Sequence, residues 1–393
     1  MDKREVIGEI ESFLRSGEKA QKKRLIGVEV EHFIINNDTK KAVPYLGKGG
    51  IEELLQELSE QAIHTKMENQ HILGLEFENY EITLEPGAQI EISMHPMHSL
   101  QEVERVYAEF RIMLEEALKK RNAHAETVGY LPYGSVEEIE IIPGNRYHAL
   151  HALYQKTGTM GRNMMRGTAS VQFSVDYYSE QDFRNKYRLA YLLSPALSLL
   201  SFNSLVFEAK KNTHYLLKNY IWAHTDPART GIIPTIFEED FGYRSYAEYA
   251  CSTPLYYETE ELKEMDAYLA ETYPHVRTRG NCLELRFADS MPIKYALSYV
   301  AFVLGLIESE EEILSLLKEL PYTISDIEYA NEQVDRYGYR AMVYGQNIGD
   351  LLEHLLEISR QNLPKEHLIY LREAERLIRE RKTIPEIESE LLC

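Results

Sequence analysis

Cysteine is scarce in this chain, and its few copies are far apart. The 393 residues include only Cys251, Cys282 and Cys393, an odd number without any CxxC spacing. A disulfide framework or a zinc site of the usual kind would need paired or closely spaced cysteines. The sequence therefore indicates neither, and it favours a reducing compartment.

The sequence also lacks the features that attract a phosphate backbone. Its formal net charge is -20, and no Lys/Arg-rich run offsets that charge locally. We therefore expect no nucleic-acid partner. No GxxxxGK[ST] phosphate loop occurs either. A small polyanion such as ATP would bind only where metal ions and a few arginines reverse the sign of the potential.

A targeting segment and a clear membrane span are likewise missing. The first residues, MDKREVIGEIESFL, alternate in charge and do not resemble a signal peptide, so we expect a cytoplasmic protein. The stretch from Leu189 to Phe207 is uncharged and nearly long enough to cross a bilayer. Pro195, several serines and Asn203 interrupt it, which favours a buried central helix. We expect no membrane partner, and a membrane protein built on this stretch is the alternative.

Hydrophobic periodicity divides the chain into two regions. Strand-like alternation occurs up to about residue 290, whereas Leu297, Val300, Leu304 and Ile307 repeat at helical spacing. We predict an α+β fold with a catalytic domain over 1–295 and a helical C-terminal region over 296–393 packed on it. We expect a monomer or a homodimer.

Four predicted strands have one apolar face and one polar face. The segments are LIGVEVEHFII, AQIEIS, TASVQFSVD and CLELRF. Because strand side chains alternate, the polar faces include Glu29, Glu31, Glu91, Gln172, Glu284 and Arg286. Glu85 stands just before the Pro86-Gly87 break that precedes the second strand.

The carboxylates on these faces need an explanation. A half-solvated antiparallel sheet is one interpretation, with the polar face simply meeting water. Glutamate is disfavoured in strands, however, and glutamates on one face repel one another. Carboxylates and an amide without a nearby Cys or His set favour a hard cation, Mg²⁺ or Mn²⁺. Arg286 would then be placed to contact a phosphate.

At these residues the sequence resembles the plant and proteobacterial type of glutamate-cysteine ligase. GVEVEHF is similar to that family's G-x-E-x-E-x-F strand, and LEPGAQIEIS is similar to its LEPG-x-Q-x-E-[LI]-S element. The likeness continues in the family's order through RYHALHALYQKTGTMGRNMM, TASVQFSVDYYSEQDFRNKYRLA, IWAHTDPARTGIIP and HVRTRGNCLELRFAD. It covers roughly residues 25 to 295, and several ordered motifs are more specific than any single one.

The resemblance implies a curved, mainly antiparallel sheet that forms a funnel for metal and ATP, related in architecture to glutamine synthetase. It places Arg286 at a phosphate, Gln172 and Arg229 in the cofactor site, and Arg229 and Lys218 beside the substrates. The metal ligands that it implies are Glu29, Glu31, Glu85, Glu91 and Glu284.

The chain departs from the family pattern near the substrates. Lys218 replaces the arginine of SMRSHIW, and Gly167, beside Arg166, replaces a second arginine. The connection from Tyr257 to Tyr273 lacks a longer family insertion, so we expect little chain to cover the amine side.

The resemblance implies that ATP phosphorylates the side-chain carboxylate of glutamate and that the amine of cysteine then attacks the acyl phosphate. Two alternatives stay open. One is the same chemistry with another amine or another acid in specialised metabolism. The other is a catalytically silent relative that binds a nucleotide or an amino acid.

Overall fold

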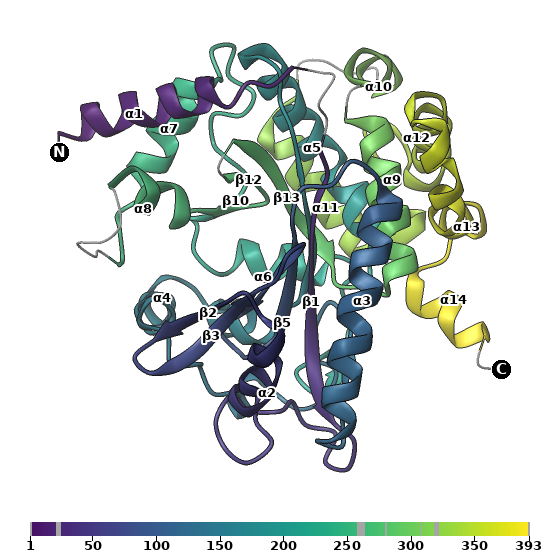
Figure 1. Ribbon diagram of the computed structural model, residues 1–393. Coiled ribbons are helices and arrows are strands. Elements are labelled where there is room, and N and C mark those ends of the chain that lie inside the picture. Colours follow the sequence, from purple (N-terminus) through teal and green to yellow (C-terminus); the bar gives the residue numbers. More distant parts are fainter. Residues whose placement is uncertain are drawn as a thin grey trace.

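The fold is a single large antiparallel sheet with helices packed around it (Figure 1). The computed structural model describes residues 2–20, 25–257, 264–279, 281–307, 309–317 and 322–391. Helices of the C-terminal half cover one side of the sheet, at the right of Figure 1, together with α3 and α5. The predicted α+β class with a mainly antiparallel sheet is confirmed.

The four strands predicted from alternation lie next to one another in the sheet, in the order β13-β7-β1-β5. All strand pairs in this sheet are antiparallel. The complete path is β12 (Val276–Arg279), β13 (Cys282–Asp289), β7 (Ser170–Val175), β1 (Gly27–Asn36), β5 (Ile90–Met94), β4 (Tyr80–Leu84), β3 (His71–Glu76) and β2 (His64–Glu68), with β6 (Ala123–Glu126) paired to the far half of β1.

Strand register brings the predicted polar residues together. Glu31 lies opposite Glu91 on β5, and Glu29 lies opposite Gln172 on β7. Glu284 on β13 lies opposite Ser174, also on β7. Directly opposite residues point to the same face of a sheet, so residues distant in sequence share one surface.

Helices make up most of the remaining chain. Their bounds are α1 (Lys3–Ser16), α2 (Ile51–Leu58), α3 (Leu100–Lys119), α4 (Asn145–Thr157), α5 (Glu180–Leu200), α6 (Leu217–Ala223), α7 (Tyr243–Ser252), α8 (Glu264–Ala270), α9 (Ile293–Leu306), α10 (Glu310–Leu317), α11 (Ile324–Tyr337), α12 (Ile348–Asn362), α13 (Arg372–Glu380) and α14 (Ile384–Leu391). Two-residue strands form three further small sheets, β8 (Val206–Phe207) with β9 (Lys210–Lys211), β10 (Thr230–Gly231) with β11 (Tyr273–Pro274), and β14 (Met342–Val343) with β15 (Gln346–Asn347).

The uncharged stretch from Leu189 to Phe207 is a buried helix for most of its length. It forms the second half of α5, in which every residue from Leu189 to Leu200 is buried. Within the described residues, no helix combines the length and the apolar character that crossing a bilayer requires. The central-helix interpretation of this stretch is therefore confirmed.

The apolar face of the sheet and the C-terminal helices share one hydrophobic core. That core includes residues from Val6 in α1 to Ile387 in α14. Phe173 of β7 meets Tyr299 of α9 edge to face, with ring centroids 6.1 Å apart. The C-terminal helices therefore pack against the apolar face of the sheet, and other elements surround its polar face.

A close helix contact offers a test of this packing. Gly305 of α9 faces α12, where an added Cβ would lie 2.4 Å from the carbonyl oxygen of Ser359. We expect Gly305→Ala to lower the free energy of unfolding by about 1–3 kcal/mol, because the backbones must separate.

Gly8→Ala in α1 is the matched control, since its Cβ would meet nothing within 4 Å. The free energy of unfolding of this variant should rise by about 0.5–1 kcal/mol, because alanine has a higher helix propensity than glycine. Urea unfolding of both variants measures the difference. Equal stabilities would show that the α9–α12 contact is looser than described.

Candidate active site

Glu85 is placed by a tight hairpin between β4 and β5. The amide N–H of Ala88 donates to the Glu85 carbonyl oxygen at 2.9 Å, and the Glu85 N–H donates to the Gln89 carbonyl oxygen at 3.0 Å. Ala88 has a left-handed conformation with φ of 65°. This is a three-residue loop with a bulge, and it explains why the Pro86-Gly87 break follows the glutamate directly.

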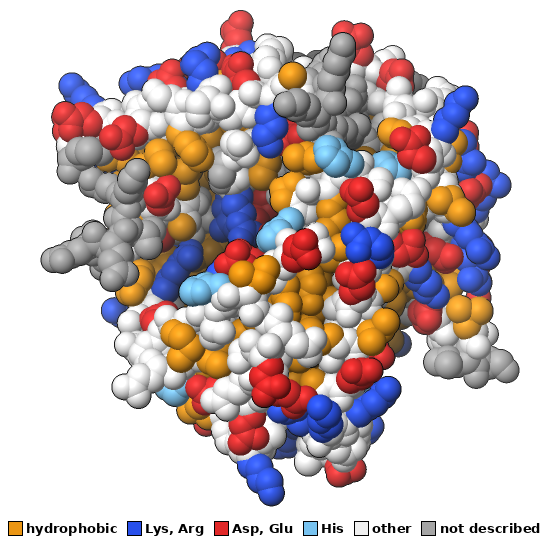
Figure 2. Space-filling model, viewed as in Figure 1, with side chains coloured by type: hydrophobic (Ala, Val, Ile, Leu, Met, Phe, Trp, Pro, Cys, Tyr) orange, Lys and Arg blue, Asp and Glu red, His pale blue; other side chains and the backbone are white. Residues whose placement is uncertain are grey.

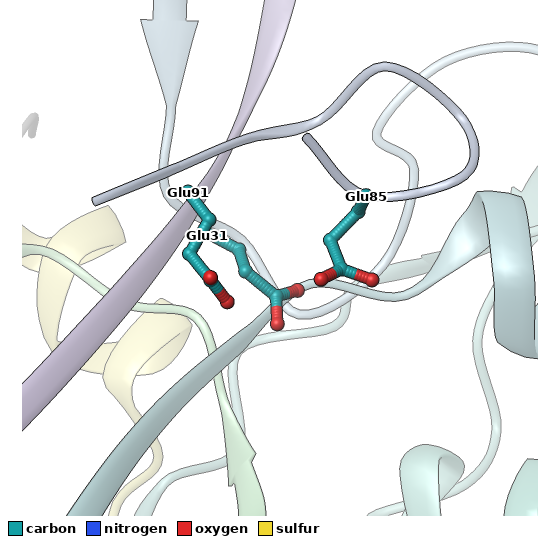
Figure 3. Close-up of side chains that lie close together, drawn as sticks. All are labelled: Glu31, Glu85 and Glu91. Atoms are coloured by element: carbon teal, nitrogen blue, oxygen red, sulfur yellow. The ribbon is translucent and has the colours of Figure 1, made fainter. Parts of the chain in front are cut away.

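Glu31, Glu85 and Glu91 form a compact carboxylate cluster (Figure 3). One carboxylate oxygen from each lies within 4.8 Å of the others. Glu31 accepts hydrogen bonds from the Ser170 backbone N–H at 2.9 Å and from the Gln172 amide at 2.8 Å. The hydroxyls of Thr83 and Ser93 donate to Glu91 at 2.6 and 2.9 Å. Neutral donors thus fix two of the carboxylates without cancelling their charge.

Burial and repulsion from neighbouring carboxylates disfavour the charged forms of Glu31 and Glu85. Burial, with the nearby Glu85 and Glu91, raises the pKa of Glu31 well above its usual value. Burial and Glu91 raise the pKa of Glu85 to about 7. A divalent cation would remove this penalty. The donor set consists of carboxylate oxygens, with the Gln172 amide beside them, which fits Mg²⁺ or Mn²⁺.

The other two predicted metal ligands, Glu29 and Glu284, face arginines. Glu284 is fully buried, and Arg277, Arg279 and Arg286 approach its carboxylate to 2.9, 3.1 and 2.5 Å. Burial alone would raise the pKa of Glu284, but these three cations hold it far below its usual range. Glu29 pairs with Arg279. The structure therefore divides the five glutamates into a cluster of three and a pair in contact with arginines, of which Glu29 still has a pKa raised to about 8 by burial and by Glu91.

Gln172 connects the two groups. Its amide nitrogen donates to Glu31, while its carbonyl oxygen accepts a hydrogen bond from Arg286 at 2.6 Å. Gln172 is only 4% exposed. This buried amide fixes the distance between the carboxylate cluster and the arginines around Glu284.

A cavity of about 400 Å³ opens over this surface. Figure 2 shows this face hollowed, with both Lys/Arg and Asp/Glu side chains inside the hollow. Its charged wall consists of Glu29, Glu31, Glu85, Glu91, Asp266, Arg146, Arg277, Arg279 and Arg286. Carboxylates at the base with several arginines around them suit a metal-bound polyanion.

Sequence reasoning did not find Arg146, Arg277 and Arg279 as site residues. A signal existed for two of them, because Arg277 and Arg279 alternate in VRTR and Arg277 lies opposite Glu284 in the register of β12 and β13. Arg146 gave no such signal. It lies on α4 and reaches the cavity only through the tertiary fold, where it donates to the Ala270 carbonyl at 2.6 Å.

The short connection between Tyr257 and Tyr273 contributes residues to the cavity wall. Residues 258–263 lie outside the described residues, but the rest of the connection forms α8, which contributes Asp266 and Leu269 to the cavity wall. Phe13 of α1 also lines the cavity. The cavity therefore has a wall to which α8 and α1 contribute, and the expectation that little chain covers the amine side stays a prediction.

Lys218 and Arg229 lie behind the cavity wall. The Lys218 ammonium donates to the Ser170 hydroxyl and to the Ala288 carbonyl. Arg229 pairs with Asp226 at 2.8 Å and donates to the Pro254 carbonyl. Neither residue lines the cavity, so their predicted roles beside the substrates stay predictions.

The replacement at position 167 has a steric cause. A Cβ on Gly167 would lie 2.7 Å from the Tyr130 ring, so no side chain fits there without movement. The neighbouring Arg166 donates to the Ile139 carbonyl at 2.8 Å and does not line the cavity. The arginine expected from the resemblance is therefore not supplied by its neighbour.

Comparisons with known proteins identify relatives that match most of the chain. The chain is 27% identical over 400 residues to glutamate-cysteine ligase B, chloroplastic, of Oryza sativa subsp. japonica, which covers 93% of this chain and 80% of that protein. The chloroplastic glutamate-cysteine ligase of Arabidopsis thaliana is 27% identical over 384 residues, with 90% and 73% covered.

A solved structure has the same fold. The glutamate-cysteine ligase of Francisella tularensis in complex with AMP superposes with a TM-score of 0.56 at 12% identity, covering 92% of this chain and 82% of that one. The model of glutamate-cysteine ligase family 2 (GCS2) matches residues 25–379. The chain belongs to glutamate-cysteine ligase family 2, whose members are ATP-dependent carboxylate-amine ligases.

Proposed function

We propose that the protein is a Mg-ATP-dependent ligase that forms γ-glutamylcysteine from glutamate and cysteine through γ-glutamyl phosphate. The observation that carries the proposal is the cluster of Glu31, Glu85 and Glu91 on the floor of a cavity that also contains four arginines. Such a cavity offers both a site for a hard cation and donors for phosphate oxygens.

Glu31, Glu85 and Glu91 would hold the metal, with the Gln172 amide beside them. When bound, the metal supplies positive charge that neutralises the phosphoryl oxygens during transfer. Glu29 and Glu284 remain candidate ligands in this proposal. They would gain metal contacts as Arg279, which now pairs with both, turns toward a phosphate.

Arg286 is the residue best placed to stabilise the transferring phosphoryl group. Its NH1 is held by Gln172 and Glu284, while its buried Nε has no hydrogen-bond partner within the part of the chain that the structure describes. An unused donor on a fixed guanidinium suits the charge that develops on phosphate oxygens.

The chemistry then needs no protein nucleophile. A glutamate side-chain oxygen attacks the γ-phosphorus of ATP, and the bond to ADP breaks. The amine nitrogen attacks the resulting acyl carbon, inorganic phosphate leaves with the electron pair of the broken C–O bond, and the proton lost by the amine passes to the departing phosphate. The cavity contributes by holding the reactants in line and by limiting access of water to the acyl phosphate.

A second candidate function is the same reaction with an amine other than cysteine. Two residues of the cavity wall favour this candidate. Phe13 comes from α1, which precedes the segment that matches the family model, and Leu269 comes from the short connection. An enzyme can distinguish a small thiol side chain from a similar aliphatic side chain by a binding free energy of only about 1–3 kcal/mol. The same catalytic groups would therefore serve an amine such as 2-aminobutyrate.

The first test is ADP release with Mg-ATP, glutamate and a panel of amines. We expect release that needs both glutamate and an amine, with cysteine, 2-aminobutyrate, alanine and simple alkylamines compared by kcat/KM. Phe13→Ala should change the ranking of the amines more than it changes turnover with the preferred one. Absence of ADP release with every amine would reject the proposed function.

A pH prediction follows from the carboxylate cluster. Unfolded glutamate has a pKa near 4.5, whereas that of Glu85 is raised to about 7 in the folded, metal-free protein. Between these values the folded state holds more protons than the unfolded state, so the stability from this group is lost as pH rises. We expect Glu85→Gln to match wild type near pH 5 and to be more stable near pH 8.

Urea unfolding in a chelator measures this difference. Added Mg²⁺ should raise the urea midpoint of unfolding at pH 8 more for the wild-type protein than for Glu85→Gln. The variant should also lose most of its ligase activity. A variant that is less stable than wild type at pH 8 in the chelator would contradict the repulsion described for this cluster.

A further inference from the structure

Trp222 is the one tryptophan of the sequence, and it lies on the wall of the active-site cavity. It belongs to α6 and is only 3% exposed. Its indole Nε1 is buried and has no hydrogen-bond partner among the described residues. A buried N–H without a partner is costly, and indole N–H groups in proteins usually have one. Its partner is therefore expected to arrive with a ligand.

The surroundings of Trp222 favour a negatively charged partner. The Lys218 ammonium lies over the indole ring, 5.1 Å from its centroid. Lys218 also donates to the hydroxyl of Ser170, whose backbone N–H binds Glu31. Two residues, Lys218 and Ser170, thus link Trp222 to Glu31 of the carboxylate cluster. A positive charge beside an unpaired N–H suits a carboxylate oxygen better than a neutral acceptor.

The positions at which the resemblance expects a second arginine offer no donor to the cavity. Position 167 has no room for a side chain, and Arg166 is tied to the Ile139 carbonyl. Arg286 is engaged by Gln172 and Glu284, next to the place proposed for the phosphoryl group. The nonreacting carboxylate of a dicarboxylic acid would need a donor apart from these.

We propose that the indole N–H of Trp222 donates a hydrogen bond to the nonreacting carboxylate of the acid substrate and so selects a dicarboxylic amino acid. The inference rests on the proposed function, because it takes glutamate as the acid. It assigns Trp222 a role in substrate specificity, with Lys218 as the charge behind the ring. The carboxylate that becomes phosphorylated would lie toward Glu31.

Trp222→Phe tests this role because it keeps an aromatic ring and removes only the N–H and the second ring. Hydrogen bonds to charged groups correspond to about a 10- to 100-fold effect. We expect the KM for glutamate to rise by about that factor, whereas the KM for ATP stays within about twofold. 4-Aminobutyrate, which lacks the second carboxylate, should be a poor substrate of both proteins. Its KM should differ little between the wild-type protein and the variant.

Tyr299→Phe is the matched control. Its hydroxyl is also buried without a partner among the described residues, but it lies on α9 and away from the cavity. Both substitutions remove an unpaired buried donor, so neither should lower stability by much, and only Trp222→Phe should raise the KM for glutamate. An unchanged glutamate KM in Trp222→Phe would overturn the proposal.

Fluorescence of the wild-type protein gives a second test that needs no variant and no turnover. All tryptophan emission comes from Trp222, so glutamate should shift or quench it and 4-aminobutyrate should not. A response to ADP with Mg²⁺ but none to glutamate would overturn the proposal in favour of a nucleotide contact. A glutamate response without ADP release by any amine would keep this inference and reject the proposed function.

Discussion

Electrostatic repulsion between buried carboxylates is the constraint on which this site depends. Antiparallel register places Glu31 directly opposite Glu91, and the β4–β5 hairpin adds Glu85 to the same spot. Like charges directly opposite in a sheet are destabilising, and burial adds a desolvation cost. Hydrogen bonds from Ser170, Gln172, Thr83 and Ser93 fix the geometry without removing the charge. The fold therefore holds together carboxylates that either bound protons or a bound cation must neutralise.

The second charge centre around Glu284 has the opposite sign. One buried carboxylate contacts three arginines, which leaves an excess of positive charge beside the carboxylate cluster in a protein whose net charge is -20. Gln172 joins the two centres through its amide nitrogen and its carbonyl oxygen. A metal complex of a polyphosphate requires both centres at a fixed separation. The carboxylates would bind the metal, and the arginines would bind the phosphates.

Sequence patterns predicted the sheet and its polar face well because strand geometry has a fixed period of two. Glu29, Glu31, Glu91, Gln172 and Glu284 all lie on the predicted face, and the predicted central helix is α5. The pattern does not reveal which carboxylates would be paired with arginines, because Arg277 and Arg279 meet Glu284 only through pairing of β12 with β13. Arg146, Phe13, Leu269 and Trp222 reach the cavity from separate helices, and nothing in their local sequence marks that convergence. Lys218 and Arg229 are placed beside the substrates by resemblance alone; they lie behind the cavity wall, and their roles there stay predictions.

Binding of Mn²⁺ to the metal-free protein, followed by titration calorimetry in buffers of different ionisation enthalpy, tests the central claim most directly. The account predicts a bound metal whose uptake releases protons near pH 7, because the pKa of Glu85 is raised to about 7 in the metal-free protein and that of Glu31 is also raised. Glu31→Gln should weaken binding by at least about tenfold, consistent with loss of one ligand of a metal site. Glu81→Gln, which removes a carboxylate paired with Lys66 in the same sheet, should leave binding unchanged. Binding of equal strength in both variants, or binding without proton release, would contradict the account.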